Sequence, residues 1–508
     1  MVENPVLRGF NPDPFFCRVG ADYYLATSTF EWFPGVQIHH SKDLVNWTLV
    51  SRPLNRASQL DMRGNPDSCG VRAPCLSFSD GQFWLVYTDV NRFDGAFKAA
   101  HTYIVTCETI DGEWADPTCV TSSGFDPSLF HDPDGRKYFL NMRWNHRSPG
   151  SGLNPANDLF DGIELQEWHP EHGLLGEVTT IYTGIDIGLT EAPRLFTRGG
   201  WYYLTVAEGG TGYDHAVTMA RSRDSRGPYE THPQKHLLTA RFAPDSPLQR
   251  VGHGEYVEGP NGEAYHSFLC GRPLKDAGGR DFCALGRETG LAVCEWREDG
   301  WLYLKRGGMV PPLTIPVAAT RVPDQAVRQQ VSIDLPPEFQ WLRTPEPERI
   351  FILTGHFLRL TGRESWGSWF EQALVARSQE NHAYSVATVV EADPPNWQRG
   401  AGITTYYNRF KFHLAVVTRE GGQRVVQLAS CLGTSEQVLT FHRNFPIPDR
   451  PIRLEVRVNG ASQQFLVSRP GGNPEPVGPV LDASIISDEG GRGGACVVHR
   501  GLCRHDRL

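Results

Sequence analysis

A repeat of about 60 residues runs five times through roughly the first 300 positions, and it constrains the fold more than any other feature. Each copy carries a glycine turn followed by a short run rich in aromatic residues. The turns lie at Gly20, Gly81, Gly135, Gly200 and Gly262, and the runs begin at Tyr23, Phe83, Tyr138, Tyr202 and Ala264. Short β-like segments fill the intervals between them. Repeated units of four short strands are typical of a β-propeller, so the chain predicts five blades.

One phase of this repeat, about twelve residues before each aromatic run, is rich in acidic residues. It holds Asp13, Ala73, Asp126, Glu191 and His253. In a propeller the innermost strands surround a common axis, so residues in one phase meet around a single cavity. Carboxyl groups in a narrow cavity shift one another's pKa, and a pair of carboxyl groups with different pKa values can hydrolyse an acetal. An Asp before proline is, taken alone, more often a turn former, so the hypothesis rests on the pattern.

Composition excludes several classes of protein. The net charge of −9 argues against nucleic-acid binding, and no window approaches 18 continuous apolar residues, so we expect no membrane span. The first ten residues lack the pattern of a signal peptide, and the 11 cysteines include no C-x-x-C pair. We therefore expect a cytoplasmic protein with free thiols and without a zinc site.

The repeat ends near residue 306, and the pattern changes. Residues 307–330 hold four prolines among small and aliphatic residues, which is typical of a semi-extended linker. From residue 331 to the end at 508, several short segments alternate apolar and polar residues, which predicts a β-sandwich. The expected fold class is thus all-β, a five-bladed propeller at 1–306 followed by a sandwich at 331–508.

Four motifs resemble glycoside hydrolase family 43, and specifically its β-xylosidases. They are residues 11–14 (NPDP), 26–36 (ATSTFEWFPGV), 124–132 (GFDPSLFHD) and 285–289 (LGRET). The resemblance extends to about residue 490 and implies that the sandwich is of the concanavalin A-like type. It implies release of xylose from the non-reducing ends of xylo-oligosaccharides by single displacement with inversion.

The resemblance also implies roles for individual residues. Asp13 matches the general base that activates water, Glu191 the general acid, and Asp126 a third carboxylate that keeps the acid protonated. Inversion would place the base and acid carboxyl groups roughly 6.5–9.5 Å apart.

Further positions match substrate-binding residues of the family: Phe30, Trp144, Arg287 and His253, with Arg72 at a position in the same pocket. By residue type alone, the aromatic residues would more often be core residues, and Arg287 could equally form a buried ion pair. The resemblance implies no required cofactor. It leaves room for a calcium ion near His253, mostly ligated by water, or for an ordinary hydrogen-bonded histidine.

The chain departs from the family at two places. Blade two has Arg72 and Cys75 where the family commonly has Trp and Asp, which puts substrate preference in doubt. The tail from about residue 492 holds four Arg, two His and no Phe, so we expect an atypical last strand.

Three hypotheses for function stay open. An exo-acting β-xylosidase is the first, and an α-L-arabinofuranosidase or bifunctional enzyme using the same carboxylates is the second. The third is a sugar-binding propeller with weak or no catalysis, which Arg72 and the tail motivate. Family relatives are often oligomers, so a homo-oligomer is compatible with the sequence, although nothing in it fixes the number.

Overall fold

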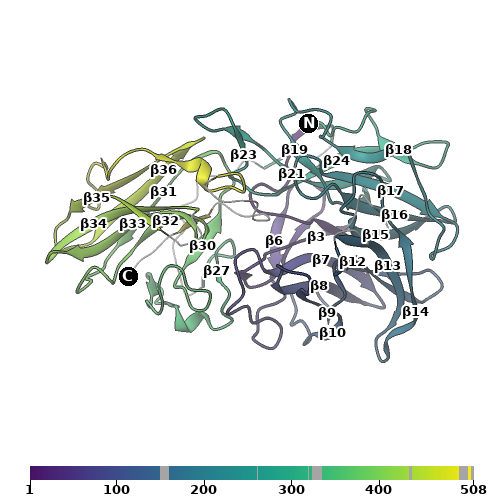
Figure 1. Ribbon diagram of the computed structural model, residues 1–508, viewed down its shortest axis with the longest axis horizontal. Helices are drawn as coiled ribbons and strands as arrows, with labels where there is room; N and C mark the ends of the chain where they lie inside the picture. The colour runs from purple at the N-terminus through teal and green to yellow at the C-terminus, as the bar shows by residue number, and fades with distance from the viewer. Residues whose placement is uncertain are drawn as a thin grey trace.

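The computed structural model describes residues 1–148, 159–259, 261–317, 320–322, 334–433, 438–490 and 502–504. These residues form two β-rich parts that lie side by side (Figure 1). The N-terminal part, purple to teal, is a propeller of five sheets, and the C-terminal part, green to yellow, is a sandwich of two sheets. The predicted all-β class and the order of the two architectures are confirmed.

Each of the five repeats forms one antiparallel sheet, with its first strand nearest the propeller axis. Blade one is β2 (Phe15–Val19), β3 (Asp22–Thr27), β5 (Gln37–Ser41) and β6 (Thr48–Ser51). Blade two is β7 (Gly70–Ser79), β8 (Gln82–Arg92), β9 (Ala99–Cys107) and β10 (Thr118–Thr121). Blade three is β11 (Gly124–His131), β12 (Lys137–Trp144), β13 (Phe160–His169) and β14 (Gly173–Tyr182). Blade four is β15 (Glu191–Arg198), β16 (Trp201–Glu208), β17 (Ala216–Ser222) and β18 (Glu230–Thr239). Blade five is β19 (Gln249–Gly252), β21 (Ala264–Gly271), β24 (Glu288–Trp296) and β25 (Leu302–Leu304), with β20 (Tyr256–Glu258) also paired to β21.

The aromatic runs of the repeat lie on the second strand of each blade, where they fill the space between neighbouring sheets. Phe83, Trp84 and Leu85 of β8, for example, are buried in a cluster that also contains residues of β2 and β7. Burial of such side chains stabilises the propeller by about 1.5–3 kcal/mol for each fully buried group.

The ring is closed by the N-terminal segment, which runs along blade five. Leu7 and Thr289 exchange two backbone hydrogen bonds of 3.1 Å, and the Asn11 N–H donates to the Arg287 carbonyl at 2.9 Å. Asn4 also exchanges side-chain hydrogen bonds with the backbone of Leu291. This closure brings Asp13, at the end of the segment, next to Arg287 on the last blade.

The sandwich consists of an eight-stranded and a five-stranded sheet. The eight-stranded sheet has the order β35 (Leu439–Pro446), β34 (Gln423–Leu432), β33 (Lys411–Glu420), β32 (Ala401–Asn408), β40 (Leu502–Arg504), β30 (Val375–Ser378), β27 (Gln340–Leu342) and β4 (Trp32–Phe33). The other contains β31 (Ala383–Val390), β36 (Ile452–Asn459), β37 (Ser462–Ser468), β38 (Glu475–Pro476) and β39 (Leu481–Asp482). Alternating side chains of both sheets, such as Ile403, Val456 and Phe465, are buried between them.

Short elements complete the described chain. The pair β28 (Phe351–Leu353) and β29 (Leu358–Leu360) and the pair β22 (Leu274–Lys275) and β23 (Asp281–Phe282) each form a hairpin. Two short 3₁₀ helices, η1 (Pro347–Arg349) and η2 (Ala483–Ile485), lie in the C-terminal part. No helix among the described residues is long and apolar enough to cross a membrane.

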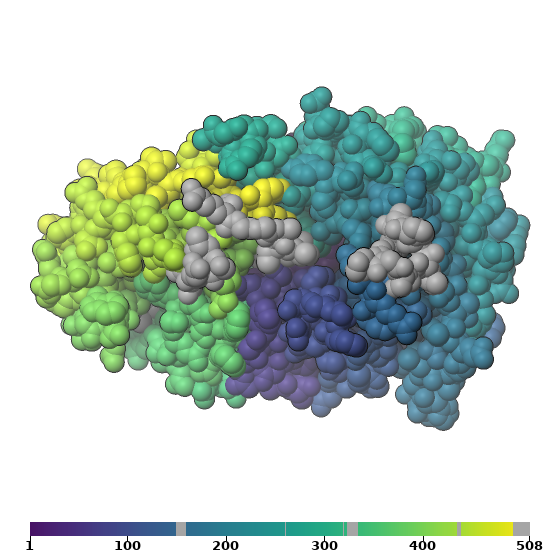
Figure 2. Space-filling view, viewed as in Figure 1, coloured from purple at the N-terminus to yellow at the C-terminus, as the bar shows by residue number. Residues whose placement is uncertain are grey.

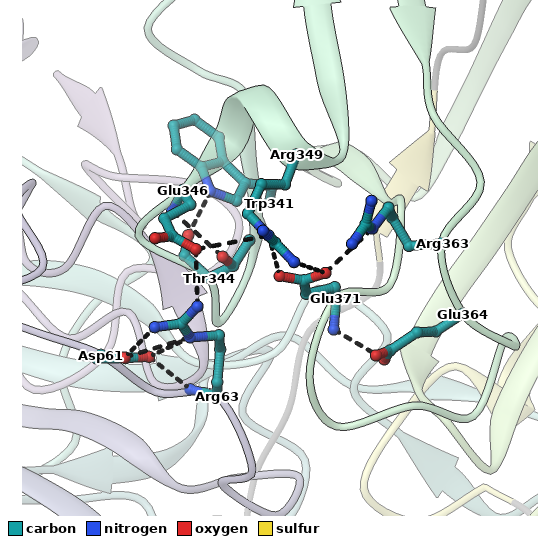
Figure 3. Close-up of polar contacts among 9 residues, drawn as sticks. All are labelled: Asp61, Arg63, Trp341, Thr344, Glu346, Arg349, Arg363, Glu364 and Glu371. Atoms are coloured by element: carbon teal, nitrogen blue, oxygen red, sulfur yellow. Dashed lines mark hydrogen bonds and ion pairs between the residues drawn. The ribbon is translucent and has the colours of Figure 1, made fainter.

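The two parts share a strand and a set of ion pairs. Strand β4 comes from the first repeat, yet it pairs with β27 of the sandwich through Trp32–Leu342 and Phe33–Trp341. In Figure 3, Arg63 of the propeller reaches Asp61 and also Glu346 of the C-terminal part, the latter at 2.8 Å. Beyond Glu346, the pairs of Arg349 and Arg363 with Glu371 continue this network. The two parts are therefore joined by a shared sheet and by ion pairs, and not by the linker alone.

The predicted linker and tail are only partly within the described residues. In the first part of 307–330, β26 (Thr314–Ile315) pairs with β1 (Val2–Glu3), so this stretch is bound to the propeller. Residues 318–319 and 323–330 lie outside the described chain, as do 491–501 and 505–508 of the tail. Strand β40 of the tail pairs with β30 and β32. The domain limits and the atypical last strand stay predictions.

Candidate functional site

A repeated backbone irregularity shapes the inner strands where the candidate residues lie. In each of β7, β11 and β15, two successive residues oppose a single residue of the neighbouring strand, which is a β-bulge. The bulges lie between Arg72 and Cys75, between Phe125 and Ser128, and between Glu191 and Arg194. The first residue of each bulge has a left-handed backbone: φ is 42° at Ala73, 54° at Asp126 and 52° at Ala192. Each is followed by a proline, which has no N–H to lose from the ladder.

These bulges revise the phase inferred from the sequence. Asp13 (φ 56°) and His253 (φ 39°) share the left-handed conformation of Ala73, Asp126 and Ala192. Glu191 therefore lies one residue before the equivalent position, in the phase of Arg72, and its predicted equivalence to Asp13 and Asp126 is wrong. A bulge places two successive side chains on nearly the same side of the strand, so Glu191 still faces the axis.

All but one of the predicted site residues line a single cavity of about 500 Å³. Asp13, Arg72, Asp126, Trp144, Glu191, His253 and Arg287 lie in its wall. They come from all five blades, from positions up to 274 residues apart. The closed propeller thus brings the three carboxyl groups together.

Asp13 is held as a carboxylate by its neighbours. The Arg287 Nη1 donates to Asp13 Oδ1 at 3.0 Å, and the Ser28 hydroxyl donates to Oδ2 at 2.6 Å. The Ala73 N–H in turn donates to the Ser28 oxygen at 2.7 Å, which fixes the hydroxyl. Burial alone would raise the pKa of Asp13, but the charge of Arg287, the hydrogen bond from Ser28 and the charge of Arg72 act together with other effects to bring this pKa below its ordinary value.

The other two carboxyl groups shift in the opposite direction. Burial, followed by the charge of Asp13, raises the pKa of Asp126 to about 7. Burial, followed by the charge of Asp126, raises the pKa of Glu191 well above its ordinary value. The cavity therefore contains one carboxyl group that ionises readily and two that hold their protons to higher pH, Glu191 among them, which is the division between base and acid that hydrolysis of an acetal requires.

Phe30 is placed differently from the expectation. Its ring is fully buried, and it is not among the residues that line the cavity. The guanidinium groups of Arg72 and Arg287 lie over it, at 4.8 and 5.8 Å from the ring centroid. Phe30 thus supports the planes of two cations that line the cavity, and its contact with a sugar stays a prediction.

Arg72 is a buried cation in the cavity wall. Its Nη2 donates to the Ser68 carbonyl at 2.5 Å, and its Nε is buried without a hydrogen-bond partner in the described residues. Its charge lowers the pKa values of Asp126 and Glu191, although burial and the neighbouring acids outweigh it.

Several wall residues carried no signal in the sequence repeat. Phe93 and Lys98 lie in the loop between β8 and β9, and Phe125, Phe160 and Thr211 also line the wall. Phe125 and Trp144 stack with centroids 4.6 Å apart. Thr211, in the glycine-rich loop after β16, accepts a hydrogen bond of 3.1 Å from Arg287 Nη2.

His253 lies behind the catalytic candidates. It is buried, with its Nδ1 3.7 Å from Asp13 Oδ1, and its Nε2 has no hydrogen-bond partner in the described chain. Burial lowers its pKa to about 3, so the imidazole is neutral and one nitrogen is free to accept a hydrogen bond or to ligate an ion.

A second group with metal-ligating side chains lies outside the cavity. His169, Glu171 and His172 are exposed at the turn between β13 and β14, with ligand atoms within 4.8 Å of one another. The Glu171 N–H donates to His169 Nδ1 at 3.1 Å, so this nitrogen already has a partner. The group lies at the end of β13 opposite Phe160, which lines the cavity.

Comparison with protein families covers both parts of the chain. Residues 2–302 match the model described as "Glycosyl hydrolases family 43". Residues 332–498 match the model described as "Beta xylosidase C-terminal Concanavalin A-like domain". The predicted type of sandwich is thereby confirmed.

Curated relatives and solved structures agree with these matches. The chain is 50% identical over 503 residues to "Xylosidase/arabinosidase 43B" of Humicola insolens, covering 96% of this chain and 91% of the relative. It is 44% identical to "Beta-xylosidase" of Bacillus subtilis, covering 97% and 94%. The crystal structure of a xylan beta-1,4-xylosidase from Bacillus halodurans superposes with a TM-score of 0.91 at 42% identity, covering 100% of this chain and 97% of that one.

Proposed function

Since the chain belongs to glycoside hydrolase family 43, we propose that it is an exo-acting β-xylosidase that releases xylose from the non-reducing ends of xylo-oligosaccharides. The observation that carries the proposal is the single cavity in which one carboxyl group has a lowered pKa and two have raised ones. A cavity at the propeller axis admits the end of a sugar chain, which favours exo action.

In this proposal Asp13 is the general base. Its Oδ1 is held by Arg287 and its Oδ2 by Ser28, so the ionised group is ready to take a proton from water at neutral pH. The water attacks the anomeric carbon from the face opposite the leaving oxygen, which inverts the configuration. The separation of 6.5–9.5 Å between the base and acid carboxyl groups stays a prediction.

Glu191 is the general acid in this proposal, and Asp126 sets its pKa. Glu191 protonates the departing oxygen while the bond to the anomeric carbon breaks. The negative charge of Asp126 is, after burial, the largest influence that raises the pKa of Glu191. We assign substrate contacts to Arg72, Arg287 and Trp144, which line the cavity.

Arabinofuranosidase activity is the second candidate. The name of the Humicola insolens relative includes both sugars, and the same three carboxyl groups would serve both substrates. Rates on p-nitrophenyl β-xyloside and p-nitrophenyl α-L-arabinofuranoside distinguish the two. Membership of a hydrolase family disfavours the third hypothesis, a propeller that only binds sugar.

The test of the proposed function is product analysis on xylotriose by NMR, together with Asp13→Asn. We expect α-xylose as the first product from the non-reducing end, and a loss of at least about 10³-fold in kcat for the variant. Asp134→Asn, an exposed partner of Arg136 on a remote turn, is the matched control and should retain the wild-type rate. β-Xylose as the first product, or an active Asp13→Asn, would contradict the assignment.

We propose that no cofactor takes part in the chemistry and that an ion near His253 would be mostly water-ligated. The neutral His253 offers one nitrogen, and calcium prefers oxygen ligands. Dialysis against EDTA should leave kcat on xylotriose within about twofold, with at most a modest loss of thermal stability. Complete loss of activity that calcium restores would show that the ion is required.

A cytoplasmic location is also our proposal. Nine cysteines have side chains that the structure describes, and eight of these are buried free thiols, which suits a reducing compartment. Fractionation of the native cells with an antibody to the protein tests it, and recovery in the culture medium would reject it.

A further inference from the structure

Cations and aromatic rings alternate along one wall of the cavity. Arg72 lies between Phe30 and Phe93, 4.8 Å from each centroid. The Lys98 ammonium follows, 5.3 Å from Phe93 and 5.1 Å from Trp144. Exposure increases along this series, from the buried Arg72 to the half-buried Lys98, so the wall runs from the interior of the pocket to its mouth.

The charges that line the cavity do not balance at mildly acidic pH. Arg72, Lys98 and Arg287 carry three positive charges. Among the acids of the described wall, Asp13 is ionised, whereas the raised pKa values of Asp126 and Glu191 keep these two groups largely protonated. Arg287 is matched by Asp13 at 3.0 Å, which leaves the positive charges of Arg72 and Lys98 without an ionised partner in the wall.

Lys98 has no carboxylate partner among the described residues of the cavity wall. Its ammonium donates to the Gly95 carbonyl at 2.6 Å and forms no ion pair with a described residue. Burial lowers its pKa, and the acid that opposes this shift, Asp94, is exposed and already paired with Arg92 at 2.9 Å. Lys137 also lies over an indole ring, that of Trp84, but it has Asp80 at 2.7 Å. The two lysines share an environment and differ in the presence of a carboxylate.

We propose that Lys98, with the rings of Phe93 and Trp144, forms a leaving-group subsite for a sugar that carries a carboxylate and is glycosidically linked to the terminal xylose. The ammonium supplies a charge-assisted hydrogen bond, and the rings supply a flat apolar surface for the sugar. The carboxylate belongs either to a uronic acid or to an aldonic acid at the reducing end. Arg72, deeper in the wall, adds attraction for the same charge.

This inference rests on the proposed function, because it concerns the unit that leaves when the terminal xylose is released. It requires no new chemistry: the same bond is hydrolysed, and the acidic sugar departs as an alcohol. It explains why the wall holds a cation at Arg72, where the family resemblance led us to expect an aromatic residue.

The test compares three substrates: xylobiose, xylobionate and a xylosyl-glucuronate disaccharide. At low ionic strength we expect kcat/KM for at least one acidic substrate to exceed that for xylobiose by about fivefold or more, and this ratio to fall toward one in 0.5 M salt. The acid that shows the higher ratio identifies the source of the carboxylate. A wild-type ratio of one or below at low salt, for both acids, overturns the inference.

Variants tie the preference to Lys98. Lys98→Met should lower the ratio of kcat/KM for the acidic substrate to kcat/KM for xylobiose at least threefold. Lys98→Arg, which keeps the positive charge, should retain most of the wild-type ratio. Lys137→Met, the matched control, should leave the ratio unchanged. A ratio that is the same in Lys98→Met as in the wild type overturns the inference.

A binding measurement separates failure of this inference from failure of the proposed function. Glu191→Gln mimics the protonated acid and adds no charge, so calorimetry with this variant reports binding without turnover. We expect xylobionate or the xylosyl-glucuronate to bind at least threefold more tightly than xylobiose. Equal binding overturns the subsite even if the wild type hydrolyses xylobiose, whereas absence of hydrolysis with preferential binding rejects only the enzymatic role.

Discussion

At the scale of single residues, the chemistry depends on carboxyl groups whose pKa values are moved in opposite directions. Arg287 and Ser28 act on Asp13, and burial acts on Asp126 and Glu191. None of these effects requires a residue of unusual chemistry. They require only that five distant segments meet around one cavity in which the carboxyl groups are buried.

Replacement of Asp126 by Asn should make the enzyme lose activity at a lower alkaline pH than the wild type. The charge of Asp126 raises the pKa of Glu191, so its removal lowers that pKa and Glu191 loses its proton at lower pH. Because the general acid must be protonated, the alkaline limb of the kcat profile should move to lower pH by about one unit or more. Rates measured from pH 4 to 9 check this. An alkaline limb that stays in place would show that Asp126 does not set the pKa of Glu191.

Residue identities were predicted well where a long motif or the repeat marked them. Asp13, Asp126, Glu191, Arg287 and His253 all lie at the cavity. The position of Phe30 was not predicted, because sequence does not show that two guanidinium groups lie over its ring. Lys98 has no counterpart in the repeat, and a lysine in a polar loop carries no signal of an aromatic neighbourhood.

At the scale of elements, the bulges of the inner strands orient the acids. A regular strand would point Glu191 and Ala192 to opposite faces. The extra residue between Glu191 and Arg194 lets Glu191 face the axis while β15 keeps its pairing to β16. In blade three, a Cβ atom at Gly124 would lie 1.5 Å from the Met142 carbonyl, so only glycine fits just before the bulge of Asp126.

Substitution of Ala192 tests the role of the bulge. Ala192 has a φ of 52°, where a β-branched side chain is strongly disfavoured. Ala192→Val should lower the free energy of unfolding by about 1–3 kcal/mol and should reduce kcat at least tenfold by displacing Glu191. Ala192→Gly tolerates the same φ and should stay within about threefold of the wild-type kcat. Urea unfolding and rates on xylobiose measure both effects, and a valine variant with wild-type kcat would show that the bulge does not position the acid.

The elements themselves were largely predictable, and their irregularities were not. The five glycine turns and the aromatic runs predicted the five blades, and the structure places the runs on the second strand of each blade. The structural equivalent of Asp13 and Asp126 in blade four is Ala192, one residue after Glu191. A bulge shifts the alternation of side chains by one residue, and the spacing of the sequence repeat is too variable to locate a position to within one residue.

At the scale of the whole molecule, the C-terminal part contacts a loop of the cavity wall through Arg250. The Arg250 guanidinium pairs with Asp488 at 2.9 Å and with Glu489, and it lies 5.2 Å from the ring of Tyr213. Tyr213 belongs to the loop that holds Thr211, the partner of Arg287. Figure 2 shows the yellow surface of the C-terminal part against the teal surface of the propeller.

Arg250→Met should therefore affect both stability and the cavity. The substitution removes the cation that both partly buried carboxylates share, which should lower the free energy of unfolding by about 2–4 kcal/mol. Release of the Tyr213 loop should raise KM for xylobiose more than it lowers kcat. Arg280→Met, which removes an 80% exposed partner of Asp276, is the matched control and should change stability by less than about 0.5 kcal/mol. Unchanged KM and stability in Arg250→Met would show that the contact is incidental.

The arrangement of the two parts was the least predictable aspect. Alternation and proline content indicated a propeller, a linker and a sandwich in series. Pairing of β1 with β26, and of β4 with β27, joins segments more than 300 residues apart. Such pairing depends on how the folded parts fit together, and it produces no periodic pattern in the sequence from which it could be predicted.

The pairing of Trp32 and Phe33 with residues 341–342 has a consequence for engineering. A gene cut between the two halves would leave an apolar strand of the catalytic half with its edge open to water, where it would invite self-association. Exchange of C-terminal halves between relatives would succeed only where the donor offers a strand that matches this short edge. The two halves thus depend on each other for a closed sheet edge, although each has a core of its own.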